Sequence, residues 1–160
     1  MIAACSNFDR VLPMIPFRFA ALALSGLCVC AGAFAQADIA AAAAKEPGAT
    51  VTPSGLVYRS LREGGGASPA ATDLVKVNYR GTLANGTEFD SSYKRNAPAQ
   101  FPLNGVIPCW TEGVQRMKVG GKAKLTCPAA IAYGERGAGG TIPPNATLQF
   151  EVELLEIAKR

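Results

Sequence analysis

The sequence predicts a small α+β domain in which a curved antiparallel sheet, a half-barrel, wraps around one short amphipathic helix. Two kinds of pattern support this fold class: stretches that alternate apolar and polar residues, and one apolar stripe with helical spacing. Gly- and Pro-rich turns separate these stretches. The chain has 160 residues, which suits one domain better than two well-buried ones.

The first 35 residues predict a secretory signal peptide. Residues 19–37 carry no charge, follow two arginines and contain the small-x-small cleavage site Ala33-Phe34-Ala35. A retained membrane anchor is the alternative, because a span needs about 20 apolar residues and this stretch is only slightly shorter. Met14 offers an alternative start, since a short basic segment follows it. Export predicts a periplasmic or secreted protein.

Residues 36–54 are rich in Ala, with Pro and Gly, and predict a flexible tail before the domain. Their one helical candidate, Asp38 to Lys45, is too short to be stable alone. The folded domain is expected over residues 55–160.

The first half of the domain predicts a short strand, a flexible loop and a hairpin. Gly55 to Leu61 forms the strand, and a run of three glycines follows it. Strict alternation then begins, with Val75, Val77 and Tyr79 facing inward. Asn85-Gly86 predicts a tight hairpin turn with positive φ at both central positions, so that Thr87 to Phe89 pairs with the alternating strand.

The second half predicts one helix and two strands. Pro108 to Lys118 places Trp110, Val114 and Met117 on one helical face, and Pro108 suits a first helical turn. Alternation resumes in Lys122 to Cys127 and in Thr147 to Ile157. Between these strands, the Gly- and Pro-rich segment from Pro128 to Asn145 is long enough to suggest a functional flap.

Charge and cysteine content exclude several functions. The net charge of +4 is mild and no basic stripe carries interleaved aromatics, which disfavours nucleic-acid binding. The chain has no His, and two isolated thiols do not make a zinc site. Removal of a signal peptide leaves only Cys109 and Cys127, which an oxidising compartment favours as a disulfide; two small buried residues are the alternative. Their spacing is unlike the Cys-x-x-Cys of redox enzymes, so thiol-disulfide exchange is disfavoured.

Five motifs in order make the chain similar to FKBP-type peptidyl-prolyl isomerases, over roughly Gly55 to Ile157. They are Val77–Gly81, Gly86–Ser92, Val106–Gly113, Ile131–Gly134 and Ile142–Leu148. The resemblance implies the FKBP fold, an enzyme without cofactor or metal, and proline-containing unfolded or exported polypeptides as substrates. It also implies macrolide inhibitors as ligands. Relatives that dimerise carry a long helical N-terminal region, which this chain has no room for, so a monomer is expected.

The resemblance also implies the residues of an aromatic pocket. Trp110 would form its floor, and the Ile107 N–H and the Tyr133 hydroxyl would bind the substrate. Asp90 would hold Tyr79 and Arg95 electrostatically rather than act as a base, because no proton is abstracted. The remaining substrate-binding candidates are Phe89, Phe101, Val106, Ile142 and Phe150. A periplasmic holdase that uses the same apolar groove is the alternative function.

Overall fold

The computed structural model describes residues 39–158. The predicted signal peptide, its cleavage site, the alternative start and the alternative membrane anchor all lie outside the described residues. Within residues 39–158, no helix combines the length and the apolar character needed to cross a membrane.

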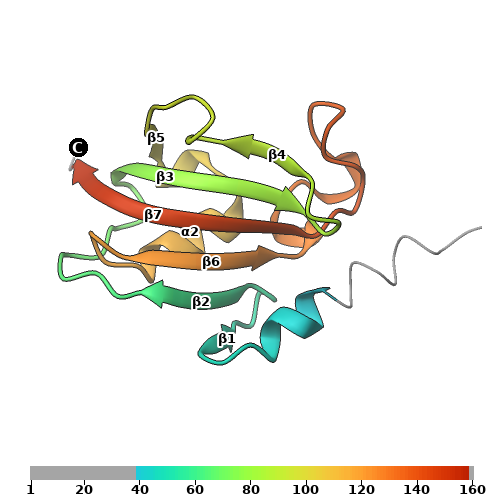
Figure 1. The fold of residues 1–160 in the computed structure, drawn as a ribbon, viewed down its shortest axis with the longest axis horizontal. Coiled ribbons are helices and arrows are strands. Elements are labelled where there is room, and N and C mark those ends of the chain that lie inside the picture. Colours follow the sequence, from blue (N-terminus) through green and yellow to red (C-terminus); the bar gives the residue numbers. More distant parts are fainter. Residues whose placement is uncertain (1–38, 159–160) are drawn as a thin grey trace, which may run out of the picture.

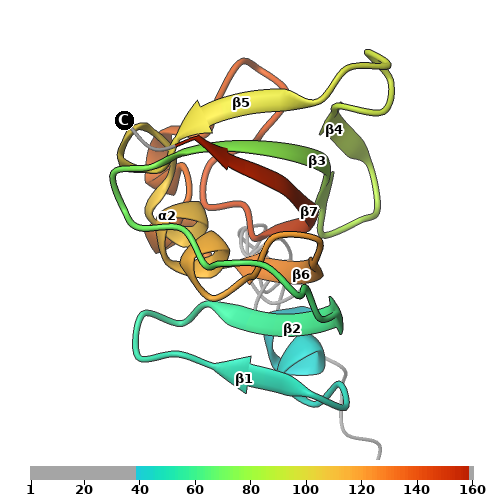
Figure 2. The same cartoon turned by 90° about the vertical axis from the view of Figure 1, so that its left-hand side faces the viewer.

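A seven-stranded antiparallel sheet curves around one helix, so the predicted α+β class is confirmed (Figure 1). Its order is β1-β2-β6-β7-β3-β4, and β5 also pairs with β3. The helix α2 (Pro108–Gln115) lies on one face of the sheet, as the view turned by 90° makes clear (Figure 2). The strands are β1 (Ala49–Val51), β2 (Val57–Arg62), β3 (Leu74–Leu83), β4 (Glu88–Ser91), β5 (Ala99–Pro102), β6 (Lys122–Cys127) and β7 (Leu148–Ala158). Three single turns of 3₁₀ helix span Leu103–Gly105, Ala129–Ile131 and Gly134–Arg136.

The hydrophobic core lies between the sheet and α2. Alternate residues of the central strands are buried, as a sheet with one covered face requires. Trp110 and Val114 of α2 pack against them from the other side. The strand residues in this core are Val75, Val77 and Tyr79 from β3, Ala123, Leu125 and Cys127 from β6, and Leu148, Phe150, Val152 and Leu154 from β7.

Helix α2 begins at Pro108 as predicted but ends at Gln115, three residues earlier than expected. The N–H groups of Arg116 and Met117 bond to the carbonyls three residues before them, Gly113 and Val114, which tightens the last turn. Met117 is still buried, at 2% exposure, although it lies beyond the helix. The predicted apolar stripe is therefore correct while the predicted helix end is not.

The turn between β3 and β4 differs from the predicted two-residue hairpin. Gly86 has a φ of 84°, but Asn85 is not among the residues with positive φ. Asn85 instead accepts a hydrogen bond on Oδ1 from the Thr87 N–H, at 2.9 Å. The register shifts between Gly81 and Thr82, and the partner strand runs over Glu88–Ser91 rather than from Thr87. The local Asx-type hydrogen bond replaces the left-handed conformation at Asn85.

The N-terminal segment also differs from the predicted flexible tail, over its described part. Residues 39–44 form a short helix, and β1 pairs with β2 in antiparallel register. The helix lies beside β1 and β2 in Figure 2. Glu46 bridges two strands, with Oε2 2.5 Å from Arg59 Nη1 on β2 and Oε1 2.9 Å from Lys124 Nζ on β6. Backbone pairing and these ion pairs supply the contacts that the local sequence lacks.

Candidate active site

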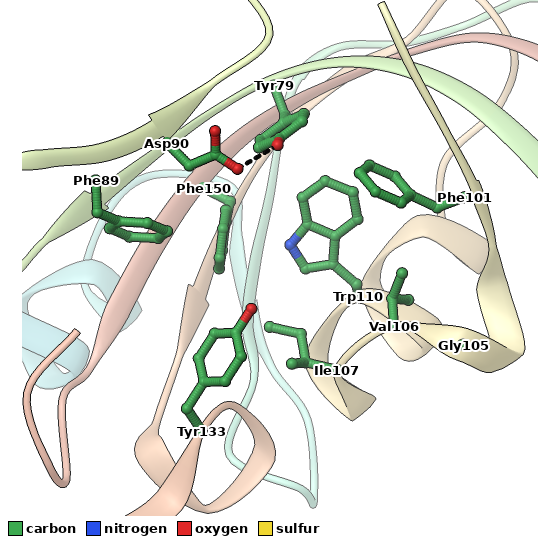
Figure 3. A pocket seen from close by; sticks show the side chains of 10 residues that line it. All are labelled: Tyr79, Phe89, Asp90, Phe101, Gly105, Val106, Ile107, Trp110, Tyr133 and Phe150. Atoms are coloured by element: carbon green, nitrogen blue, oxygen red, sulfur yellow. Dashed lines mark hydrogen bonds between the residues drawn. The ribbon is translucent and has the colours of Figure 1, made fainter. Parts of the chain in front are cut away.

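A concave pocket of about 450 Å³ opens at one end of α2. Every strand on one half of the sheet contributes to it, together with the start of α2 and the segment between β6 and β7 (Figure 3). Its lining residues are Tyr79, Phe89, Asp90, Phe101, Gly105, Val106, Ile107, Trp110, Tyr133 and Phe150. The lining is therefore mostly aromatic and aliphatic, with one carboxylate.

The Trp110 indole, which is 4% exposed, forms the base of the pocket. Three rings meet it edge to face: Tyr79 at 5.2 Å between centroids, Phe150 at 5.4 Å and Phe101 at 5.7 Å. Within the described residues, the buried Trp110 Nε1 has no hydrogen-bond partner. Figure 3 places this nitrogen on the side of the indole that faces Phe150. The edge-to-face contact between these two rings is a favourable one.

Tyr79, Asp90 and Arg95 form a closed polar network at the pocket edge. The Tyr79 hydroxyl donates to Asp90 Oδ2, and Arg95 Nη1 donates to Asp90 Oδ1. Arg95 Nη2 donates to the Tyr79 oxygen at 2.8 Å, and the guanidinium lies 5.5 Å from the centre of the Tyr79 ring. The Tyr79 backbone is held as well, because its N–H donates to Ser92 Oγ at 2.9 Å.

In this network the pKa of Asp90 is lowered and the pKa of Tyr79 is raised. Partial burial acts to raise the pKa of Asp90, but the hydrogen bonds from Tyr79 and Arg95 outweigh it and hold that pKa below its usual value. Burial, followed by the hydrogen bond to Asp90, raises the pKa of Tyr79. At neutral pH the site therefore contains an ionised carboxylate and a neutral phenol.

Two hydrogen-bond donors at the pocket are free to bind a ligand. Within residues 39–158, neither the Ile107 N–H nor the Tyr133 hydroxyl donates a hydrogen bond. Ile107 immediately precedes α2, where the first N–H groups of a helix have no intrahelical acceptor. Tyr133 is 39% exposed, and its hydroxyl points toward the cavity in Figure 3. Both donors are therefore available to peptide carbonyls that enter the pocket.

All of the predicted site residues line the pocket except Arg95 and Ile142. Arg95 lies at its edge and acts on the lining through Asp90 and Tyr79. Ile142 is 8% exposed and belongs to the hydrophobic core. Its backbone exchanges hydrogen bonds with that of Ala138 at 2.9 and 3.0 Å, so the loop folds back on itself at this point. Its expected position near the substrate stays a prediction. Gly105 lines the pocket but was not predicted, since a residue without a side chain leaves no chemical signal in the sequence.

Cys109 and Cys127 form a disulfide whose Cα atoms are 5.8 Å apart. It joins the first turn of α2, next to Trp110, to the end of β6. Both cysteines are fully buried, so a thiol-exchange partner has no access to the bond. Among the described residues, no cluster of His, Cys, Asp and Glu side chains could hold a metal ion.

The chain belongs to the family described as FKBP-type peptidyl-prolyl cis-trans isomerase, which matches residues 65–155. An FKBP-type 22 kDa peptidyl-prolyl cis-trans isomerase of Escherichia coli strain K12 is 58% identical over 114 residues, covering 71% of this chain and 55% of the relative. The isomerase FkpA of Aeromonas hydrophila is 60% identical over 119 residues, covering 74% and 44%. The chain thus spans about half the length of these curated relatives.

Solved structures give the same result for the fold. The crystal structure of FkpA from Escherichia coli superposes with a TM-score of 0.76 at 48% identity, covering 78% of this chain and 58% of that one. A peptidyl-prolyl cis-trans isomerase from Pseudomonas syringae superposes with a TM-score of 0.73 at 36% identity, covering 79% and 92%. The FKBP-like fold predicted from the sequence is thereby confirmed.

Proposed function

We propose that this chain is a peptidyl-prolyl cis-trans isomerase that accelerates rotation about X-Pro bonds. The observation that carries the proposal is the pocket built on Trp110, which combines an aromatic lining with two free hydrogen-bond donors. Membership of the family supports the same activity.

The barrier to this reaction is amide resonance, about 18–20 kcal/mol. Resonance places negative charge on the carbonyl oxygen, and water stabilises this planar, polar form. The twisted amide is less polar, so transfer from water into the aromatic pocket costs the planar ground state more than the transition state. A difference of about 5 kcal/mol corresponds to an acceleration of several thousandfold.

The free donors would anchor the substrate. Hydrogen bonds from the Ile107 N–H and the Tyr133 hydroxyl to the carbonyls that flank the X-Pro amide would fix the peptide on both sides of the rotating bond. Because neither donor then stabilises the planar form of that amide, anchoring does not raise the barrier. The prolyl ring would lie on Trp110, between the rings of Tyr79, Phe101 and Phe150.

Asp90 acts as a positioning group in this mechanism. Its carboxylate accepts hydrogen bonds from Tyr79 and Arg95, which fixes the Tyr79 ring against Trp110. No proton leaves the substrate during rotation, so the lowered pKa of Asp90 suits an electrostatic role and not that of a base.

The substrates we propose are proline-containing unfolded or exported polypeptides, and macrolides are the proposed inhibitors. The proposed location is the periplasm or the exterior, after removal of residues 1–35, with residues 55–160 as the isomerase domain. A monomer is the proposed active form.

The test is the isomerisation rate of a proline-containing tetrapeptide, with and without a macrolide. The wild type should exceed the uncatalysed rate, which has a time constant of tens to hundreds of seconds. Trp110→Ala should abolish most of the excess, while Leu61→Ala, at an exposed site on β2, should keep it. A wild-type rate equal to the uncatalysed one would refute the proposal.

The same variants separate catalysis from a holdase role. If Trp110→Ala loses isomerisation but still prevents aggregation of a proline-free client, the chaperone activity uses another surface. If the wild type prevents aggregation without accelerating rotation, the holdase function replaces the proposed one.

A further inference from the structure

Gly81 occupies the one inward-facing position of β3 at the pocket that has no side chain. Val75, Val77, Tyr79 and Gly81 are buried at alternate positions along this strand, and each would point its side chain toward the core. In register, Gly81 lies between Asp90 on β4 and Phe150 on β7. Two of the three Phe rings that line the pocket, Phe89 and Phe150, fill the space that a Gly81 side chain would take.

The rings leave no room for even one methyl group. A Cβ at Gly81 would lie 2.6 Å from Phe89 Cζ, 2.8 Å from Phe89 Cε2 and 3.0 Å from Phe150 Cε1. Carbon atoms in proteins pack at about 3.5–4.0 Å, so one of the rings would have to move. Gly81 has no positive φ, so its backbone does not require glycine. Glycine is required here because the Phe89 and Phe150 rings occupy the space of a side chain.

Phe89 is the ring that would yield. Phe150 is 4% exposed and is held edge to face against Trp110, at 5.4 Å between centroids. Phe89 is only half-buried, and it is the far end of its ring that meets the added carbon. The two Phe rings meet at 90° with centroids 5.6 Å apart, so displacement of Phe89 changes the wall that both present to the pocket.

We propose that Gly81 is a positioning residue for the substrate, because its missing side chain lets the Phe89–Phe150 pair lie back against β3 and sets the room for the prolyl ring. The inference rests on the proposed isomerase function. Gly81→Ala should fold, because the contacted atoms belong to a side chain that can turn, and should narrow the pocket. Exclusion of the prolyl ring before rotation is expected to raise KM more than it lowers kcat.

The experiment is a double-mutant cycle with Phe89→Leu, which removes the ring atoms Cζ and Cε2. Gly81→Ala should lower kcat/KM for a proline tetrapeptide about tenfold in the wild-type background and less than about twofold in the Phe89→Leu background. Equal losses in both backgrounds, or no loss in either, would overturn the proposal. The matched control is Gly65→Ala, the same change at a loop position with no atom within 4 Å of the added carbon.

A second readout does not depend on catalysis. The chain has a single Trp, so its fluorescence reports on the pocket floor alone. Gly81→Ala should shift the Trp110 emission and weaken its response to the tetrapeptide, and Gly65→Ala should do neither. If the wild type proves inactive, this arm still decides the role of Gly81. Unchanged emission and unchanged peptide response would overturn it even in an active enzyme.

The remaining possible outcome is that the Gly81→Ala variant does not fold. If Gly81→Ala alone fails to fold but the double variant with Phe89→Leu folds, the coupling is present and the proposal stands. If the double variant also fails, the fold needs glycine at this position for a reason other than Phe89, and the proposal is wrong.

Discussion

The Tyr79 ring meets the Trp110 indole at 85°, with 5.2 Å between the ring centroids. The Tyr79 hydroxyl lies at the other end of the same side chain and donates to Asp90. One residue therefore joins the apolar floor of the pocket to the polar network at its edge.

Tyr79→Phe separates these two roles, because it keeps the ring and removes the hydroxyl. We expect kcat/KM to fall about tenfold and the unfolding free energy to fall by about 1 kcal/mol, the usual value of one hydrogen bond. Tetrapeptide kinetics and urea unfolding measure these changes. Tyr58→Phe on β2, outside the pocket, is the control, and an equal activity loss there would contradict the assignment.

The lowered pKa of Asp90 predicts a dependence of stability on acid. A carboxyl group whose pKa is lowered by folding stabilises the folded state above its unfolded pKa of about 3.9, and this contribution disappears as the pH falls through the lowered value. The difference in unfolding free energy between wild type and Asp90→Asn should be constant above about pH 5 and shrink below about pH 4. Denaturant titrations across this range test it. If the difference in unfolding free energy between wild type and Asp90→Asn instead grows at acidic pH, the ionised Asp90 does not stabilise the folded state, and the interpretation of the network is wrong.

Because the pKa of Tyr79 is raised, we expect its phenol to ionise at a higher pH than an ordinary tyrosine does. The phenol should stay protonated up to and beyond its usual pKa of about 10. The pKa values of Tyr58 and Tyr93 are raised as well, so the measurement is a difference between two folded proteins. Ultraviolet absorbance titration of wild type minus that of Tyr79→Phe should show the missing tyrosine ionising above pH 10. Ionisation of Tyr79 at the usual pKa of a tyrosine would contradict both its burial and its hydrogen bond to Asp90.

The disulfide predicts a large effect on stability. It closes a loop between positions 18 apart in the sequence, which restricts the unfolded chain by about 3 kcal/mol. The double variant Cys109→Ala and Cys127→Ala should lose this amount in urea unfolding. Thiol titration of the denatured, unreduced protein provides the check, since two reactive thiols from these positions would disprove the bond.

The docked N-terminal segment predicts resistance to proteolysis. Glu46→Gln breaks ion pairs with Arg59 and Lys124, which are partly exposed and together contribute at most about 1 kcal/mol. Cleavage within residues 39–54 should become faster in this variant, and faster in wild type at high salt, because salt screens the pairs. Glu63→Gln in the exposed loop after β2 is the control. Rapid cleavage of wild type at low salt would contradict this and support the flexible tail that the sequence predicted.

The strands and the helix start were predictable because their signals are local. Alternation at Val75, Val77 and Tyr79 follows from one buried face, and Pro108 fits only the first turn of a helix. The position of Trp110 under the pocket followed from the resemblance and not from these periodicities.

The remaining features depend on contacts between distant segments. Nothing near Glu46 in the sequence indicates that Arg59 and Lys124 will bind it. Gly105 carries no side chain that could mark it in the sequence. Such features require the three-dimensional register, which short sequence patterns do not contain.

Strand β7 comes after every other strand in sequence, yet it lies between β6 and β3 at the centre of the sheet. It also supplies Phe150, which holds the indole in place. A nascent chain emerging from a ribosome or a translocation channel would lack this central strand until its synthesis had passed residue 158. The pocket is therefore incomplete during synthesis, and it forms only with the late, long-range pairing of β7 between its neighbours.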